Sequence, residues 1–343
     1  MRKYVVGIVG ASGAVGEEIL KILEEQDFPV KKIVPLASAR SAGELVEFKG
    51  KSYEIIETTD EVFAKQGIEI AFFSAGGSVS ERFVPSAVRA KAVVIDNTSF
   101  YRMDSDVPLV VPEVNPQDIA LWEKRGIIAN PNCSTIQMVQ ALAPLHKEFG
   151  ITRVDVSTYQ AVSGAGKSGM EELVLQMQKF FAFELDSTSP SVFPHRIALN
   201  AIPHIDVFQD NGYTKEEMKM IKETQKIMHE DFAISATCVR VPILRSHSES
   251  ISITCKKEGT CKRAQEVLKS APNIVVLDNP SANLYPMPSV ATDTDETYVG
   301  RIRVDCFNPH ILHFWCVADQ IRVGAATNAV RIVQKWISLQ KDK

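Results

Sequence analysis

The first 130 residues alternate between short apolar runs and segments whose apolar side chains recur at helical spacing. KYVVGIV at residues 3–9 has the composition of a buried strand, and the apolar residues of EEILKILEE at residues 17–25 fall on one helical face. Further apolar runs predict strands at residues 31–38, 68–76, 92–99, 109–115 and 126–130. Strands that alternate with helices predict an α/β fold with a mostly parallel, Rossmann-like sheet.

A glycine turn, GASGAVG, joins the first predicted strand to the first predicted helix. It places Gly10, Gly13 and Gly16 at three-residue spacing. Glycines here let the backbone approach a pyrophosphate, and the following helix N-terminus offers N–H donors and a partial positive charge. The spacing differs from the strict dinucleotide pattern G-x-G-x-x-G. A plain turn is therefore the alternative, but the order strand, turn, helix favours a nucleotide site.

The loop after the predicted strand 31–38 bears on which cofactor the site takes. In NAD sites this strand often ends in an acidic residue that binds the ribose 2′-hydroxyl. Here Arg40 and Ser41 stand at that point, and a guanidinium and a hydroxyl suit a 2′-phosphate. The loop favours NADP over NAD, with a solvated loop arginine as the alternative.

Cys133 is the candidate nucleophile among six cysteines. It follows an Asn-Pro-Asn turn and opens a helical pattern in which Ile136, Val139, Leu142 and Leu145 form one stripe. A helix N-terminus stabilises a thiolate, and its N–H groups can hold an oxyanion. Beside a nicotinamide site, such a cysteine predicts acylating aldehyde chemistry through a thioester. The alternative is a buried packing cysteine, which is the role we assign to the other five.

A second glycine loop competes with the first. Residues 161–168, AVSGAGKS, match the P-loop pattern G-x-x-x-x-G-K-[ST] except that Ala161 replaces the first glycine. A strand-like segment precedes this loop and a helical segment follows it, and IVVLD at 274–278 resembles a strand that ends in a magnesium-binding aspartate. A P-loop NTPase is thus a competing hypothesis, although it leaves Cys133 unexplained.

Residues 214–228, TKEEMKMIKETQKIM, predict a helix. Thr214 and Glu217 form a capping-box pattern at its start. Glu216 and Lys219 are three residues apart and share a face, which a solvent-exposed charged face explains equally well. Glu217 and Lys222 are the competing pair.

Composition and charge exclude some classes of function. The chain has 343 residues, 45% of them apolar, and a formal net charge of −4. Its length allows two domains, and the charge argues against a nucleic-acid partner. No apolar run reaches the roughly 20 residues that span a bilayer, and no secretory signal pattern is present, so we expect a cytoplasmic protein with no membrane partner. His310 and His313 lie in an alternating run that directs them to opposite sides of a strand, and we expect no metal site.

Seven motifs in one order along the chain resemble the bacterial-type aspartate-semialdehyde dehydrogenases. They are GASGAVG, NTSFYR (97–102), PEVN (112–115), NPNCSTIQ (130–137), TYQAVSGAGKSG (158–169), VRVPILRSHSESI (239–251) and DQIRVGAATNAVRI (319–332). The resemblance covers about residues 1–340. It implies NADPH-dependent reduction of L-aspartyl 4-phosphate to L-aspartate 4-semialdehyde with release of phosphate, toward lysine, threonine, methionine and diaminopimelate.

The resemblance also implies roles for individual residues. Cys133 would be the nucleophile, His247 the acid–base residue and Gln160 the group that orients the acyl chain. The implied substrate contacts are Arg240 at the α-carboxylate, Arg102, Glu216 and Lys219 at the phosphate, and Asn132 beside the nucleophile. The implied cofactor contacts are Gly10, Ser12, Gly13, Ala14, Val15, Arg40, Ser41, Ser163, Gly164, Gln320 and Asn328.

The architecture implied is that of glyceraldehyde-phosphate dehydrogenase. Residues 1–130 would form the NADP-binding domain, completed by a C-terminal helix at 325–343, and residues 131–324 an α+β catalytic and dimerisation domain with strands at 302–307 and 313–319. A homodimer or homotetramer is expected. Another acyl-phosphate reductase, such as N-acetylglutamyl-phosphate reductase or a glyceraldehyde-phosphate dehydrogenase, would share the chemistry. A non-catalytic NADP sensor is a third hypothesis. For residues 180–213 the sequence leaves two interpretations, a lid or a partner surface.

Overall fold

The computed structural model describes residues 2–185 and 189–341, and the chain divides into two compact units. The first unit is Met1–Asn132 with Ala325–Lys343, and the second is Cys133–Gly324. Within the described ranges, no helix is both long enough and apolar enough to cross a membrane.

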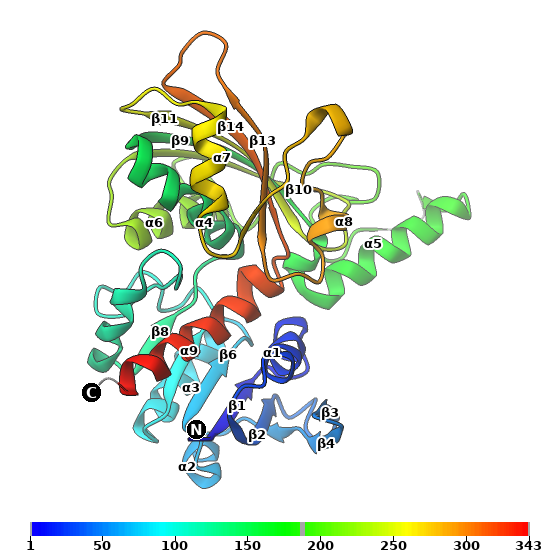
Figure 1. Ribbon diagram of the computed structural model, residues 1–343. Coiled ribbons are helices and arrows are strands. Elements are labelled where there is room, and N and C mark those ends of the chain that lie inside the picture. Colours follow the sequence, from blue (N-terminus) through cyan, green and yellow to red (C-terminus); the bar gives the residue numbers. More distant parts are fainter. Residues whose placement is uncertain (1, 186–188, 342–343) are drawn as a thin grey trace. The chain divides into compact units, whose positions relative to one another are not determined.

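A six-stranded parallel sheet with the order β5-β2-β1-β6-β7-β8 forms the centre of the first unit (Figure 1). Its strands are β1 (Tyr4–Val9), β2 (Val30–Ala37), β5 (Ile56–Glu57), β6 (Ile70–Phe73), β7 (Val93–Asp96) and β8 (Ile127–Ala129). A small hairpin, β3 (Leu45–Phe48) with β4 (Lys51–Glu54), lies between β2 and β5 in the sequence. The predicted parallel α/β sheet is confirmed.

Helices cover both faces of this sheet. On one face α1 (Ala14–Glu25) and α9 (Thr327–Lys341) share an apolar core with Ile8 and Phe72, to which they contribute Ile19 and Val330 among others. Phe73 follows Phe72 in β6 and so points to the other face. There it stacks on Phe63 of α2 (Val62–Gln66), which contacts α3 (Gly77–Arg89). The last helix of the chain thus completes the core that the first helix begins.

The prediction of a strand at residues 109–115 is wrong. Leu109 makes one isolated bridge to Ala129, and the chain then turns. The side chain of Asn115 accepts the N–H of Val111 and donates to the carbonyl of Leu109. These bonds take the place of a ladder, and Pro112 has no N–H to give to a neighbouring strand. The short helix η1 (Pro116–Lys124) follows the turn.

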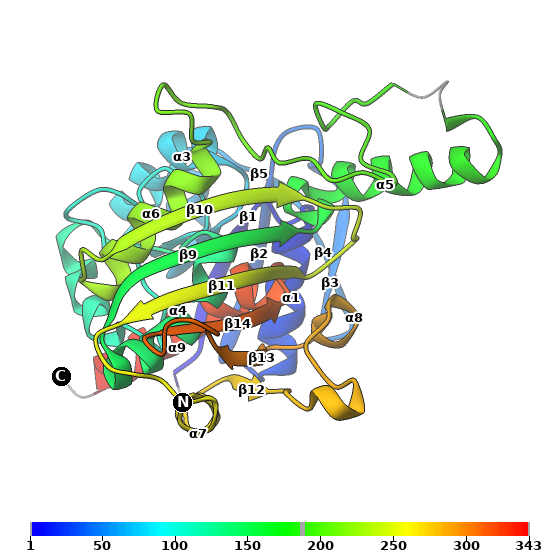
Figure 2. The same ribbon diagram turned by 90° about the horizontal axis from the view of Figure 1, so that it is seen from above.

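The second unit contains a mixed sheet with the order β10-β9-β11-β14-β13-β12 (Figure 2). Its strands are β9 (Ile151–Gln160), β10 (Ala233–Arg240), β11 (His247–Cys255), β12 (Ile274–Val276), β13 (Thr297–Val304) and β14 (Ile311–Ala318). β9 and β10 are parallel, and β11 runs antiparallel to both β9 and β14. The strand expected at 302–307 ends at Val304. There the chain turns, and the Asp305 carboxylate accepts the N–H groups of Phe307 and Asn308.

One face of this sheet is buried and the other is open. On the buried face lie α4 (Cys133–Phe149), α6 (Lys215–Met228) and α7 (Cys261–Lys269), whose Leu142, Met220 and Leu268 share a core with Val156. The opposite face carries the partly exposed rings of Tyr159 and Trp315, with centroids 5.3 Å apart. Among the described residues, this unit also has η2 (Val162–Ala165), α5 (Gly166–Phe181), η4 (Pro280–Ala282) and α8 (Pro288–Ala291), and η5 (Arg322–Ala326) begins at its end.

The connection from α4 to β9 brings the site residues together. Only Gly150, with φ +70°, separates the end of α4 from the start of β9, so β9 runs back along α4 toward Cys133. Gln160 at the end of β9 pairs in register with Arg240 at the end of β10, and β11 begins beside them at His247. Strand alternation directs these three side chains to the face that α4 covers.

Candidate active site

Cys133 is the first residue of α4, as the sequence predicted, and its side chain is partly exposed. The backbone of Gly324 lies against it, since a Cβ on Gly324 would stand 2.7 Å from the Cβ of Cys133. Burial raises the pKa of the Cys238 and Cys316 thiols and raises that of Cys255 to about 11. These three thiols therefore stay protonated near neutral pH, whereas Cys133 has the place in the fold that suits a nucleophile.

Arg240 is a buried cation whose charge interacts with that of Cys133. Burial lowers the pKa of Arg240, and the negative charges of Glu216 and of the Cys133 thiolate oppose that shift. Its Nη1 donates to the carbonyl of Ala161 at 2.6 Å. A Cβ on Gly164 would stand 2.8 Å from the same Nη1, so only glycine leaves room for the guanidinium. The structure thus places Arg240 and Gly164, both expected in the site, in direct contact.

His247 is fully buried, and its ring is fixed by one backbone hydrogen bond. The N–H of Ala161 donates to Nδ1 at 3.0 Å, whereas Nε2 has no hydrogen-bond partner among the described residues. Burial lowers the pKa of His247 well below its ordinary value, and the charge of Arg240 lowers it further. The ring is therefore neutral near pH 7 and carries its proton on Nε2. Sequence reasoning did not find the contribution of Ala161, because a backbone N–H leaves no mark on residue type.

Gln160 and the start of α6 form the next part of the cluster. Gln160 Nε2 lies 3.4 Å from Glu216 Oε1, and the other oxygen of Glu216 accepts from Lys219 Nζ at 3.0 Å. Lys219 also donates to Asp206 at 2.8 Å. Burial alone would lower the pKa of Lys219, but the charge of Glu216 and the bond to Asp206 outweigh it and raise the pKa. No motif marked Asp206 in the sequence.

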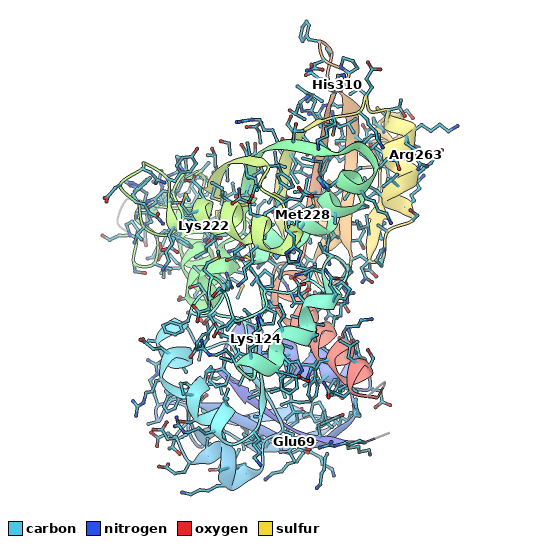
Figure 3. The ribbon with its side chains drawn as sticks, turned by 90° about the vertical axis from the view of Figure 1, so that its left-hand side faces the viewer. Glu69, Lys124, Lys222, Met228, Arg263 and His310 are labelled. Atoms are coloured by element: carbon cyan, nitrogen blue, oxygen red, sulfur yellow. The ribbon has the colours of Figure 1, made fainter. Side chains whose placement is uncertain are left out.

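The structure separates the two competing pairs on α6. Thr214 and Glu217 form the predicted capping box, and Glu217 also accepts the N–H of Cys238. Both oxygens of the Glu217 carboxylate thus accept backbone N–H groups. Lys222, labelled on α6 in Figure 3, is exposed, whereas Lys219 is held by two carboxylates. The geometry favours Glu216 and Lys219 as the pair that belongs to the cluster.

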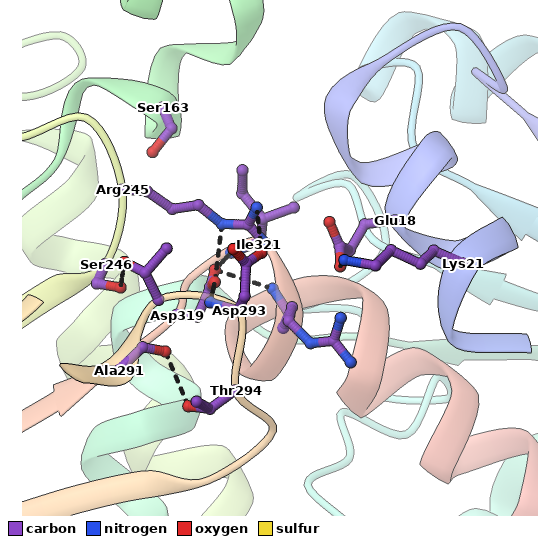
Figure 4. Close-up of polar contacts among 12 residues, drawn as sticks. Glu18, Lys21, Ser163, Arg245, Ser246, Ala291, Asp293, Thr294, Asp319 and Ile321 are labelled. Carbon is purple, nitrogen blue, oxygen red and sulfur yellow. Dashed lines mark hydrogen bonds and ion pairs between the residues drawn. The ribbon is translucent and has the colours of Figure 1, made fainter. Parts of the chain in front are cut away.

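A polar network holds the turn between β14 and η5 (Figure 4). The Asp319 carboxylate is fully buried, binds Arg245 at 2.7 Å and accepts the N–H of Ile321 at 3.0 Å. The next residue, Gln320, accepts the N–H of Ser246 through Oε1 and donates to Ser163 through Nε2. Ser163 and Gln320, both expected at the cofactor, are therefore hydrogen-bonded to each other.

The second glycine loop does not have the structure of a phosphate-binding P-loop. Its first N–H, at Ala161, goes to His247, and those of Val162 and Ser163 go to the carbonyls of Ile243 and Leu244. A P-loop needs such N–H groups for phosphate. The aspartate expected to bind magnesium, Asp278, accepts the N–H groups of Arg301 and Ile302 instead.

The first unit contains a cavity of about 440 Å³ at the carboxyl ends of β1, β2 and β6. It is lined in part by predicted cofactor residues, namely Gly10, Ser12, Gly13, Arg40 and Ser41, and by Ala37, Glu57, Thr58, Ser74 and Arg82. Ser12 Oγ and Ser41 Oγ lie 3.5 Å apart, so the first glycine turn and the loop after β2 meet here. The predicted Ala14 and Val15 begin α1 and are not among the lining residues. Arg82, which adds a second guanidinium, was not predicted.

The glycines of the first turn are required by its shape. Gly10 has φ +93°, and a Cβ on Gly16 would stand 2.2 Å from the carbonyl oxygen of Gly10. No side chain caps α1 at Gly13. An uncapped helix N-terminus and a close backbone turn suit a pyrophosphate, and a guanidinium at the end of β2 suits a 2′-phosphate. The residues present therefore fit a nicotinamide dinucleotide.

Three other predicted residues lie in the first unit. Arg102 is buried and donates to the carbonyls of Asn97 and Asn130. Asn328, on α9, donates to Asn130 Oδ1 at 2.7 Å and to the carbonyl of Val110 at 3.0 Å, so its amide links α9 to the segment that precedes Cys133. Asn132 is buried and directly precedes Cys133 in the chain.

Comparison of the sequence with protein families matches both units. A profile described as "Semialdehyde dehydrogenase, NAD binding domain" matches residues 5–122, and one described as "Semialdehyde dehydrogenase, dimerisation domain" matches residues 142–323. The aspartate-semialdehyde dehydrogenase of Campylobacter jejuni is 64% identical over 339 residues, which cover 99% of both chains. That of Aquifex aeolicus is 56% identical over 333 residues, 96% of this chain and 97% of its own.

Solved structures give the same relationship. Aspartate semialdehyde dehydrogenase II from Vibrio cholerae, complexed with ASA, is similar with a TM-score of 0.95 at 43% identity, over 98% of this chain and 99% of that chain. Aspartate semialdehyde dehydrogenase with NADP from Candida albicans is similar with a TM-score of 0.75 at 25% identity, over 97% and 98% of the two chains.

Proposed function

The chain belongs to the semialdehyde dehydrogenase family, and we propose that it is an NADP-dependent aspartate-semialdehyde dehydrogenase of amino-acid biosynthesis. It would interconvert L-aspartyl 4-phosphate and L-aspartate 4-semialdehyde and serve the routes to lysine, threonine, methionine and diaminopimelate. The observation that carries the proposal is the position of Cys133 at the start of α4, in the unit that also holds the buried side chains of Arg240 and His247.

Cys133 would act as the nucleophile toward the acyl carbon. Its thiolate gains stability from the N-terminus of α4 and from the positive charge of Arg240. In the reductive direction the sulfur forms a bond to the acyl carbon while the carbon–oxygen bond to phosphate breaks, which leaves a thioester and inorganic phosphate. A bound nicotinamide cofactor supplies the hydride that reduces this thioester.

His247 would stabilise the oxygen of the tetrahedral species on Cys133. Because Nδ1 accepts the Ala161 N–H, the neutral ring presents Nε2–H as a donor. That hydrogen bond strengthens as negative charge grows on the oxygen, and collapse of the species expels the Cys133 thiolate and leaves the aldehyde. The Gln160 side chain, held at Glu216, would orient the acyl group.

The two ends of the substrate call for two sets of cations. Arg240 would bind the α-carboxylate, for which a planar guanidinium is suited. Lys219, with Glu216 beside it, would bind the phosphate, and the resemblance gives Arg102 the same role. Asn132 would complete the substrate contacts next to Cys133.

The cofactor would be NADP rather than NAD. Arg40 and Ser41 at the cavity of the first unit offer the charge and hydroxyl that a 2′-phosphate needs, and Gly10, Ser12 and Gly13, with Ala14 and Val15 at the start of α1, would hold the pyrophosphate. Ser163, Gly164 and Gln320 would lie beside the nicotinamide. Asn328 would contribute indirectly, through its hydrogen bond to Asn130.

The chain would work in the cytoplasm as a homodimer or a homotetramer. The open face of the second unit, with Tyr159 and Trp315 exposed in part, is the surface we assign to the contact between subunits. Aromatic side chains are enriched in such interfaces. The family profile that matches this unit is described as a dimerisation domain.

The test follows absorbance at 340 nm during oxidation of L-aspartate semialdehyde with NADP and phosphate. Phosphate-dependent NADPH formation is expected for the wild type and for Cys306→Ala, which changes an exposed cysteine, and is expected to be absent in Cys133→Ala. Turnover of N-acetylglutamate semialdehyde instead would retain the mechanism and overturn the substrate. Activity in Cys133→Ala equal to wild type would overturn the mechanism.

A further inference from the structure

Residues 191–198 lie against α5 and are fixed there by two buried polar side chains (Figure 2). The Glu172 carboxylate accepts the N–H groups of Ser191 and Val192 and the hydroxyl of Ser191. Gln176 Oε1 accepts the N–H groups of Ile197 and Ala198, and Gln176 Nε2 donates to Glu172 at 2.9 Å. A buried carboxylate with several N–H donors holds its partners in one geometry, so residues 191–198 have a defined place on α5.

Phe193 is carried by this fixed segment and packs into a small apolar core. The core comprises Val162, Leu173, Ile197, Ala198 and Ile202, with Phe193 against it. A Cβ on Gly169 of α5 would stand 3.1 Å from Cζ of Phe193, so the ring lies close to the helix backbone. The ring therefore packs against α5 and against this apolar core.

The Phe193 ring also lies over Arg240. The guanidinium carbon is 5.9 Å from the ring centroid, within the range of a cation–π contact. Arg240 is buried, and its Nη1 is taken by the carbonyl of Ala161 beside Gly164. The orientation of the guanidinium is thus set by three neighbours, of which Phe193 is the one supplied by the segment after α5.

We propose that Phe193 is a positioning residue for substrate binding, which holds the Arg240 guanidinium in the orientation that recognises the α-carboxylate of the aldehyde. The inference rests on the proposed function. An aromatic ring on a guanidinium limits its motion and keeps water from that side, and both effects strengthen an arginine–carboxylate pair. Residues 191–198 then form a fixed wall of the carboxylate subsite.

The test compares Phe193→Leu and Phe193→Tyr with wild type, and uses Phe307→Leu as the matched control. Leucine keeps an apolar side chain but removes the aromatic face, and tyrosine restores that face. Phe307 lies in the turn between β13 and β14 and is 95% exposed, so the same change there leaves the site intact. Thermal unfolding of each variant establishes that it is folded.

Two aldehydes separate carboxylate recognition from general damage. Phe193→Leu is expected to raise the KM for L-aspartate semialdehyde roughly 5- to 30-fold. Its kcat, its KM for phosphate and its KM for NADP are expected to stay within about twofold of the wild-type values. Phe193→Tyr is expected to stay within about threefold of wild type. With 3-aminopropanal, which lacks the carboxylate, kcat/KM of Phe193→Leu is expected to stay within about twofold of the wild-type value.

Other outcomes overturn the inference. An equal loss with both aldehydes, a loss in kcat alone, or a Phe193→Leu enzyme that matches Phe307→Leu would each mean that the ring does not act through Arg240. If Phe193→Leu fails to fold, Glu172→Gln, which weakens the hold on Ser191 and Val192, must raise the same KM selectively for the inference to survive. A wild-type enzyme that turns over neither aldehyde would overturn the proposed function itself.

Discussion

Ala161 donates its backbone N–H to Nδ1 of His247 at 3.0 Å, although the two residues are 86 positions apart in the chain. The bond determines which ring nitrogen carries the proton, and it leaves Nε2–H as the donor that the proposed function assigns to the substrate oxygen. Arg240 donates to the carbonyl of the same residue, so the backbone of Ala161 orients both the imidazole and the guanidinium.

Replacement of His247 checks this orientation. His247→Ala removes the Nε2 donor and is expected to lower kcat by about 10²- to 10³-fold, the range for the loss of one oxyanion donor. His247→Gln is expected to recover part of that loss, because its amide can accept the Ala161 N–H and still donate. The measurement is kcat for aldehyde oxidation, with circular dichroism to compare the folds. Equal activity of the two variants would contradict the donor role.

The buried His247 also predicts how stability depends on pH. Its folded pKa is held well below the ordinary value by burial and by Arg240. Below about pH 6.5 the unfolded chain binds a proton here that the folded chain does not, so the free energy of unfolding falls as the pH drops and is fully regained above that pH. Urea unfolding at pH 7.5 and at pH 5 measures the effect. Between these two values the free energy of unfolding of the wild type is expected to fall by up to about 2 kcal/mol more than that of His247→Gln. Parallel losses in the two proteins would refute the assignment.

Lys219 and Lys222 lie on the same helix but are expected to differ in their effect on phosphate. Lys219→Met removes the cation between Glu216 and Asp206 and leaves two carboxylates that repel an anion. The KM for phosphate is expected to rise about tenfold or more, whereas Lys222→Met changes an exposed side chain and serves as the control. Initial rates at varied phosphate measure the difference. A similar rise in both variants would mean that general surface charge attracts the phosphate.

Gly324 is expected to be intolerant of a side chain because of its contact with the nucleophile. In Gly324→Ala the new Cβ would stand 2.7 Å from the Cβ of Cys133, so either the helix start or the turn must shift. We expect a loss of roughly 1–3 kcal/mol in the free energy of unfolding and at least a tenfold loss of kcat. Gly77→Ala is the control, because its nearest neighbour would lie at 3.9 Å. Wild-type kcat in Gly324→Ala would show that the contact is unimportant.

Arg40 is expected to decide between the two nicotinamide cofactors. Arg40→Ala removes the guanidinium at the end of β2 and is expected to raise KM for NADP about 10- to 100-fold, the size of a lost charged hydrogen bond. KM for NAD is expected to change by less than about threefold, since NAD has no 2′-phosphate. Arg89→Ala, on α3 and outside the residues that line the cavity, is the control. An equal loss with both cofactors would contradict a role at the 2′-phosphate.

Much of the local structure could be predicted because it depends on neighbours in sequence. The helix that opens at Cys133, the capping box of Thr214 and Glu217, and the strand, turn and helix around Gly10 all follow from spacing within a few residues. The strand expected at 109–115 failed for a related reason. Its apolar residues matched a strand, but the side chain of Asn115 satisfies the backbone from within the segment.

The parallel sheet, the glycine turn and the cysteine at a helix start could be predicted from residue order alone, since periodicity and backbone freedom are properties of a short stretch of chain. The contacts of Ala161 with His247, Asp206 with Lys219 and Phe193 with Arg240 became visible only in the folded chain. Each of these joins segments brought together by strand register or by packing on a helix. Such contacts depend on the fold of the whole chain. The sequence around a backbone N–H, a loop carboxylate or an apolar ring does not indicate which distant residue it will contact.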